Sequence, residues 1–167
     1  KELLWKTHLS YSKTPISMGK RLFYNNPKQF KIPTLEYHKN EFFFDQIELL
    51  GFPIELPFDM VEKKTNKHIK VKEMKKYLNK EIIMMGYFIS RKTVTTINKK
   101  LMYFGTFLDE DGTFLDTTHF PNEAYKYPFT GNGVYLLKGK VTVEFDFYSL
   151  EVICMERLQY KKDKRFN

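Results

Sequence analysis

The side chains best suited to binding a ligand are the aromatic residues of a β-prone run, Leu101–Leu108. In a strand, side chains two positions apart share a face, so Met102, Phe104 and Thr106 lie on one face. Tyr103, Gly105 and Phe107 lie on the other face, and the alternation alone does not say which face points outward. Exposed aromatic rings can stack on the bases of unpaired nucleic acid, so this run predicts binding rather than catalysis.

Basic side chains cluster just before this run, within a polar segment. Arg91, Lys92, Lys99 and Lys100 flank or lie in the segment that leads into Leu101. Lysine and arginine beside exposed rings attract the phosphates of a strand, although solvated loop residues have the same composition. The whole chain of 167 residues has a formal net charge of +8, which makes polyanions the default class of partner.

The acids and histidines do not form a recognisable catalytic or metal-binding pattern. Three of the four acids near the strands, Asp109, Glu110 and Asp111, are explained by a β-turn, and Asp116 stands alone. Read as a calcium loop, the stretch from Asp109 ends on Phe120 where a glutamate is required. The histidines are scattered, at His8, His38, His68 and His119. We therefore expect no catalysis, cofactor or metal in this fragment.

The order of β-prone and turn-prone segments predicts a mainly β fold. The predicted order is three strands, a short helix and a two-stranded hairpin. The strands are expected at 81–89, 101–108, 113–120, 134–145 and 150–158, and the helix at 122–127. Gly86 suggests a bend or a bulge in the first strand. This is the order of the OB-fold, a five-stranded barrel that binds oligonucleotides on strands 2 and 3 and on loops 1–2 and 4–5.

The segments before the barrel are expected to form an arm and a helical linker. We divide the chain into 1–40, an arm; 41–80, a linker with helices at 41–50 and 70–79; 81–160, the barrel; and 161–167, a basic and frayed tail. Helix 41–50 should bury Phe43, Ile47 and Leu50. Alternatively, Gln46–Phe52 is a peptide that binds a sliding clamp.

Composition also predicts the cellular setting. The single cysteine, Cys154, rules out a disulfide framework within the chain and fits a reducing compartment, so we expect a cytoplasmic protein. No apolar run is long enough to span a bilayer, and no membrane partner is expected. The chain begins at Lys1 in a helix-like stretch, which we interpret as a piece of a longer protein.

Several stretches of the chain resemble one known family. MYFGTFLDEDG (Met102–Gly112), followed by His119-Phe120-Pro121, resembles the Met-x-Phe-x-Thr-Leu-x-Asp-x-x-Gly and Phe-Pro signature of the OB domain in bacterial DNA polymerase III alpha subunits. The preceding KTVTTINKKLMYF looks like the lysine loop of that family, and IELLGFPIELPFD (Ile47–Asp59) is similar to its linker.

This resemblance implies both a function and a set of contact residues. The parent would be a DNA-directed DNA polymerase, a nucleotidyltransferase, and this piece would bind the single-stranded template during DNA replication, near the sliding clamp and other replisome subunits. The family pattern places Phe104 outward, where a base stacks, with Thr106 beside it. His119 would stack or contact phosphate, or else be a structural histidine. The expected contacts are Arg91, Lys92, Lys99, Lys100, Phe104, Thr106, His119, Phe145 and Phe147.

Two other functions fit the same fold. One is the anticodon-binding OB domain of a class II aminoacyl-tRNA synthetase, which shares the aromatic second strand. The other is a protein-docking barrel without a nucleic-acid ligand. Preference for folded tRNA would favour the first, and failure to bind oligonucleotides would favour the second.

Overall fold

The computed structural model describes residues 2–12, 34, 36, 38–62 and 67–166. It divides into two compact units, Lys1–Lys39 and Asn40–Asn167. In the first unit, helix α1 (Glu2–Ser12) confirms the helix expected at the start of the chain, and Leu3, Leu4 and Trp5 on it are exposed. Most of the expected arm falls outside the described residues.

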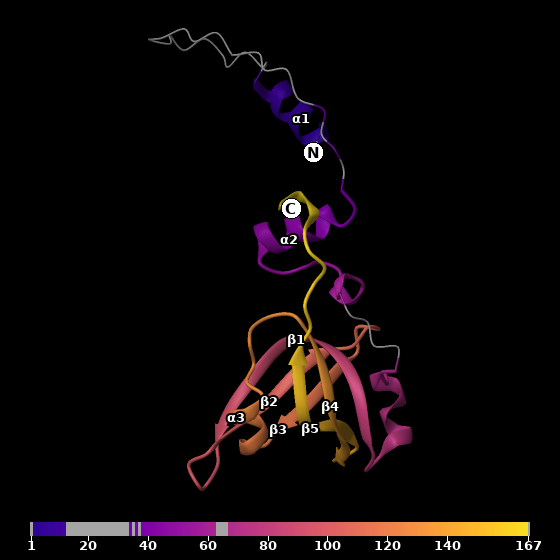
Figure 1. Ribbon diagram of the computed structural model, residues 1–167, viewed down its shortest axis with the longest axis vertical. Helices are drawn as coiled ribbons and strands as arrows, with labels where there is room; N and C mark the ends of the chain where they lie inside the picture. Colours follow the sequence, from indigo (N-terminus) through magenta and orange to yellow (C-terminus); the bar gives the residue numbers. More distant parts are fainter. Residues whose placement is uncertain (1, 13–33, 35, 37, 63–66, 167) are drawn as a thin grey trace. The chain divides into compact units, whose positions relative to one another are not determined.

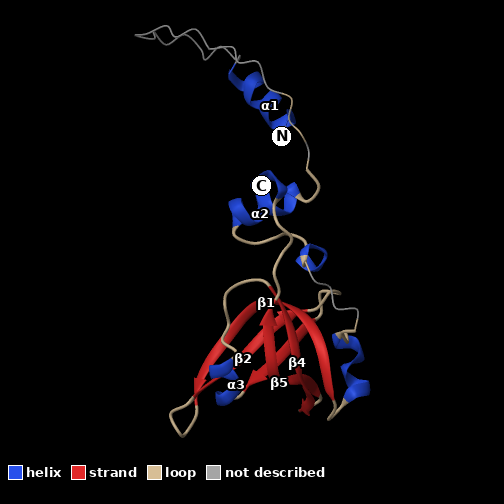
Figure 2. Ribbon diagram, viewed as in Figure 1, coloured by secondary structure: helices blue, strands red, loops and turns tan. Residues whose placement is uncertain are grey.

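The second unit contains a closed five-stranded barrel (Figures 1 and 2). Its strands are β1 (Glu81–Thr95), β2 (Leu101–Leu108), β3 (Phe114–His119), β4 (Val134–Glu144) and β5 (Phe147–Arg157). They pair in the order β1-β2-β3-β5-β4, and β1 closes the barrel by pairing with β4. Only β3 and β5 are parallel. With helix α3 (Pro121–Lys126) between β3 and β4, this confirms the predicted OB-fold.

Strand β1 is longer than the sequence suggested. The polar segment Arg91–Lys100 was expected to be a loop, but β1 runs to Thr95 and its end pairs with Leu101. The β-branched residues Thr93, Val94 and Thr95 favour a strand, which accounts for the difference. The first half of β1 pairs with β4 and the second half pairs with β2. The end of β1 therefore belongs to the β1–β2 hairpin and does not pair with β4.

Gly86 has a different role from the one predicted. The register shift in β1 lies between Phe88 and Ser90, so the bulge is not at the glycine. A Cβ atom at Gly86 would lie 2.8 Å from the Cβ of Phe107, a separation too short for two carbon atoms. Glycine is needed there because the Phe107 side chain packs directly against its Cα.

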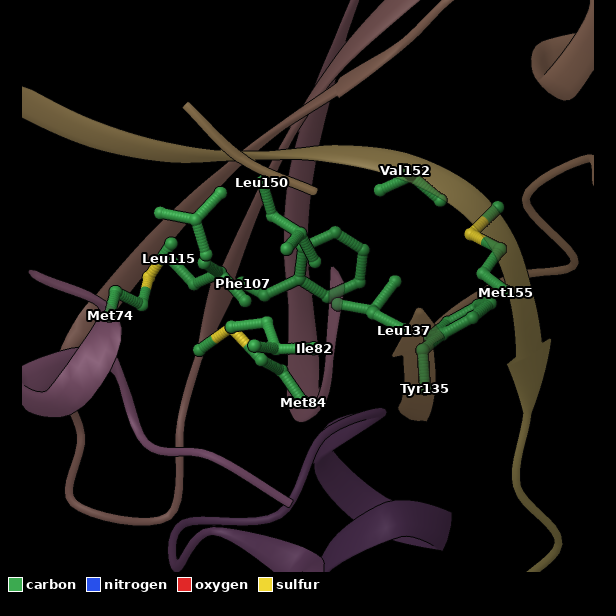
Figure 3. Close-up of a cluster of buried hydrophobic side chains, with 11 residues drawn as sticks. Met74, Ile82, Met84, Phe107, Leu115, Tyr135, Leu137, Leu150, Val152 and Met155 are labelled. Carbon is green, nitrogen blue, oxygen red and sulfur yellow. The ribbon is translucent and has the colours of Figure 1, made fainter. Parts of the chain in front are cut away.

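The core fills the barrel with the inward side chains of all five strands (Figure 3). Phe107 lies at its centre and its ring contacts those of Phe88, Phe129 and Tyr135. The buried cluster consists of Met74, Ile82, Met84, Phe107, Leu115, Tyr135, Leu137, Val141, Leu150, Val152 and Met155. Met74 comes from the linker, from the 3₁₀ helix η2 (Val71–Tyr77), where an α-helix was expected.

The linker supplies a second, smaller core. It begins with α2 (Glu41–Leu50), which ends at Gly51 with φ 80°, and continues through the 3₁₀ helix η1 (Pro57–Met60). Phe58 and Val61 from this region are buried with barrel residues Met85, Tyr87 and Val134. Within the described residues, no helix is both long enough and apolar enough to cross a bilayer.

Helix α2 only partly follows its predicted packing. Phe43 and Ile47 are half-buried, but Leu50, expected on the buried face, is exposed. Gln46 is buried instead, and its Oε1 accepts a hydrogen bond from the backbone N–H of Ile54 at 2.8 Å. A clamp-binding peptide requires the Gln46 side chain to be accessible, but here this side chain points into the linker.

The described part of the basic tail, up to Phe166, is held by hydrogen bonds, so the expectation that it frays was wrong for these residues. Tyr160 forms a β-bridge with Val61, and the N–H of Lys161 donates to the carbonyl of Met60 at 2.8 Å. The final helix η3 (Lys164–Phe166) carries Arg165, which bonds to Asp163 and to Asp45 of α2. These carboxylates, Asp163 first, raise the pKa of Arg165. The tail is held because its charge has specific acidic partners.

Candidate nucleic-acid interface

Phe104 lies on the outer face of β2, as expected. Its side chain is 44% exposed, whereas Phe107, three positions along, is completely buried. Across the sheet, Phe104 is paired with Lys92 of β1 and with Thr118 of β3. Directly paired residues share a face, so the phenyl ring has an ammonium group on one side and a hydroxyl on the other. This is a flat, accessible ring with a cation beside it.

Two further phenylalanines on this face were missed in the sequence. Phe114 at the start of β3 is 65% exposed, and Phe120 just after the strand is also exposed. Both have the same parity as Thr118, the partner of Phe104. Once Phe104 is placed outward, the β2–β3 register puts Phe114 on the same face, and Phe120 follows directly after the last paired residue, His119. The sequence contained this signal, but it could be used only with the register known. We call the set Phe104, Phe114 and Phe120 the outer aromatic face.

The β4–β5 turn adds exposed aromatic rings near one end of this face. It consists of Phe145 and Asp146, with φ of 49° and 65°. The sequence placed this turn later, at 146–149. Positive φ at both positions fits a type I′ turn, which favours asparagine and glycine, so Phe145 is strained there and its side chain is 95% exposed. Phe147, also exposed, is level with Phe114, because Ser149 is opposite Asp116 in the parallel pair.

The β1–β2 hairpin turn supplies cations at the opposite end of β2. The N–H of Lys99 donates to the carbonyl of Thr96, and the N–H of Thr96 donates to the carbonyl of Lys100. Lys99 has φ 57°, which closes the turn and leaves Ile97 fully exposed. Within the described parts of the chain, Lys92, Lys99 and Lys100 have no acidic partner. Their charges are available to a ligand.

Arg91 does not share the face of Phe104. It is paired with Gly105, so it points to the opposite side of the sheet from its neighbour Lys92. Its guanidinium carbon lies 5.0 Å from the ring centroid of Tyr103 and 5.5 Å from that of Phe129. Cation–π contacts of this kind stabilise the underside of the hairpin. The structure therefore separates Arg91 from the other predicted contacts.

Thr106 brings a carboxylate onto the face. Its Oγ1 donates to Oδ1 of Asp116 at 3.0 Å, and Glu151 lies opposite Thr118. Negative charge at the centre of the face disfavours phosphates there. A strand on this surface would turn its bases toward the rings and its phosphates toward the lysines of the β1–β2 hairpin.

His119 is buried, so it does not reach a ligand on the surface. Its Nε2 lies 2.9 Å from Oγ1 of Thr117, and that hydroxyl donates to the carbonyl of Gly105. Because the hydroxyl hydrogen is already used, Nε2 carries the ring proton, and Nδ1 has no hydrogen-bond partner among the residues that the structure describes. Burial lowers the pKa of His119 to about 4. His119 is therefore the structural histidine of the two alternatives, because side chains alternate along β3 and that of His119 points inward.

The acidic turn is structural, as the β-turn interpretation proposed. The carboxylate of Asp109 accepts backbone hydrogen bonds from Asp111, Thr113 and Val71. Asp111 binds Lys70 at 2.7 Å, which raises the pKa of Lys70 and lowers that of Asp111. Lys72 also contacts Asp111, so Asp111 partly neutralises the positive charge of Lys70 and Lys72 in the linker. Among the described residues, no group of three or more His, Cys, Asp or Glu side chains could hold a metal ion.

Comparisons with protein-family models and with curated proteins returned no match.

Proposed function

We propose that the barrel binds single-stranded DNA across the outer aromatic face. The observation that carries this proposal is Phe104, exposed at the centre of β2 beside Lys92, which has no acidic partner among the described residues. OB barrels hold single strands by stacking bases on aromatic rings and following phosphates with cations. Because every base has an aromatic plane, we expect binding that tolerates sequence changes.

The arrangement of the face supports an unpaired strand rather than a duplex. Rings at Phe114, Phe104 and Phe120 offer stacking surfaces that the paired bases of a duplex cannot reach. Lys99 and Lys100 lie just before the start of β2, Lys92 lies opposite Phe104, and Asp116 lies within the face. Bases over the rings and phosphates near the lysines satisfy both features.

The proposal extends to the parent protein on sequence grounds. The Met102–Gly112 stretch, which resembles the polymerase III alpha signature, includes most of β2 and the turn after it. On this resemblance, the barrel guides the single-stranded template of a replicative DNA polymerase, with the sliding clamp and other replisome subunits nearby. The polymerase chemistry would be carried out by another part of the parent.

Replacing Phe104 by alanine is expected to weaken binding of a labelled oligothymidine. Loss of one stacked base costs about 1–3 kcal/mol, which raises the dissociation constant roughly fivefold to more than a hundredfold. Fluorescence anisotropy measures this change. The matched control is Phe42→Ala, which removes a still more exposed ring from α2, 71% against 44%, and should leave affinity unchanged.

Two outcomes would count against this function. Equal affinities for the wild type and Phe104→Ala would remove the outer aromatic face from the interface. Tighter binding of folded tRNA than of random single strands would instead favour an anticodon-binding barrel. If the folded protein bound no oligonucleotide at all, the protein-docking alternative would take its place.

The three lysines should determine much of the salt dependence. For single strands, the slope of log affinity against log salt changes by about 0.7 for each neutralised phosphate. Replacing Lys92, Lys99 and Lys100 by alanine should therefore flatten the slope by about 2. The control replaces Lys75, Lys76 and Lys80, which are exposed on or beside η2. An identical loss of slope in both triple variants would show only a nonspecific effect of net charge.

A further inference from the structure

A pocket lies between the β1–β2 hairpin and helix α3, next to the outer aromatic face but not on it. Its volume is about 670 Å³, within the range of small-molecule sites. Figure 1 shows α3 beside the strands of this hairpin. The pocket is lined by Lys100 and Leu101 at the start of β2, by Tyr103, and by Pro121, Asn122, Ala124, Tyr125 and Lys126 of α3. None of the residues used so far to explain base stacking lines it.

The lining has the chemistry of a site for an anion with a flat apolar body. It includes no carboxylate, and it includes the ammonium groups of Lys100 and Lys126. Neither lysine has an acidic partner in the described part of the chain; Lys126 instead lies 5.2 Å from the ring centroid of Tyr127. Leu101, Tyr103 and Tyr125 supply apolar and aromatic walls. A nucleotide combines a flat base with a phosphate and fits this description.

The position of the pocket connects it to the proposed DNA path. Leu101 and Tyr103 are on the face of β2 opposite Phe104, so the pocket lies on the underside of the hairpin. The β2–β3 pairing begins only at Tyr103, which leaves the edge of β2 open at Leu101 and Met102, beside Phe120 and Pro121. Along β2, Leu101 is three residues from Phe104, or about 10 Å at the rise of a strand. A strand stacked on Phe104 can reach the pocket with a nearby nucleotide by passing over this open edge of β2.

We propose that this pocket takes up one nucleotide of the bound single strand, an inference that rests on the function proposed above. The base lies against Tyr125 and Tyr103, and the phosphate lies between Lys100 and Lys126. An acidic peptide would match the charge, but the aromatic walls and the continuity with the outer aromatic face favour the nucleotide. The site makes α3 part of the ligand-binding surface as well as a connection between strands.

The test uses Tyr125→Ala and Lys126→Ala in the whole chain, because both side chains are exposed, Tyr125 at 91%. Affinity is measured for oligothymidines that lengthen by one nucleotide at a time. The wild type should gain affinity at the length that first fills the pocket. Tyr125→Ala should lose about tenfold above that length and nothing below it. Phe104→Ala should weaken binding at every length.

Direct evidence comes from thymidine monophosphate alone, followed by the amide chemical shifts of Leu101, Asn122 and Tyr125. Shifts that saturate, and that are lost in Lys126→Ala but kept in the control Lys75→Ala, would support the site. Oligonucleotide binding that depends on Phe104 but is unaffected by Tyr125→Ala at all lengths would overturn the pocket and leave the proposed function intact. An acidic peptide that shifts these amides, when thymidine monophosphate does not, would also overturn it.

Discussion

Replacing Phe107 by alanine should lower the free energy of unfolding by about 3–5 kcal/mol, the usual cost of deleting a buried phenyl ring. Phe107 is completely buried, and its ring centroid lies 5.6 Å from that of Phe88 and 5.8 Å from that of Tyr135. The Phe107 side chain also packs against Gly86, which has no side chain to move into the space that the ring would leave. Urea unfolding monitored by circular dichroism measures the loss.

The control for this prediction is Phe114→Ala, which removes the same ring from the neighbouring strand. Phe114 is 65% exposed, so its loss should change stability by less than about 1 kcal/mol. Equal destabilisation of the two variants would contradict the assignment of inner and outer faces, and with it the position of Phe104. The pair therefore tests the fold and the site together without any ligand.

Acid should destabilise the protein through His119. The ordinary pKa of the histidine is 6.5, and burial lowers the pKa of His119 in the folded state to about 4. Between these values the unfolded chain binds a proton that the folded chain does not, so stability falls as the pH drops from 6.5 to 4. This difference in pKa between the unfolded and folded states corresponds to a loss of about 3 kcal/mol in the free energy of unfolding. Above pH 7 both states are neutral, and the effect disappears.

The variant His119→Leu separates this effect from the titration of carboxylates. Leucine is similar in size and cannot bind a proton, and Thr117 retains its hydrogen bond to Gly105. Unfolding free energies of both proteins, measured at several pH values, should diverge below pH 6.5, with the variant less sensitive to acid. Parallel curves would show that His119 becomes protonated inside the folded barrel, which contradicts its burial.

Alternation along the chain predicted most of the barrel. Each β-prone run is short and ends in a turn residue, so local patterns fixed the order of the strands, the helix after β3 and the fold class. The acidic turn was also recognised correctly, because two of the backbone groups that bond to Asp109 are only two and four residues away. Phe104 was placed outward through the family pattern, not through alternation.

The site needed information that no local pattern contains. The register between β2 and β3 places Phe114 on the face of Phe104 and turns His119 inward. The extension of β1 sends Arg91 and Lys92 to opposite sides of the hairpin. The ordered tail depends on Arg165 meeting Asp45, 120 residues earlier in the chain. All of these depend on which segments meet across the barrel.

The sequence by itself therefore determined the elements and their order, because strand and turn preferences depend on near neighbours. Only the tertiary structure decided which aromatic rings and cations are accessible together. Closure of the barrel buries one side of every strand, and it brings α3 next to the start of β2 to form the pocket. Exposure is a property of the packed molecule, since it depends on residues far apart in the chain.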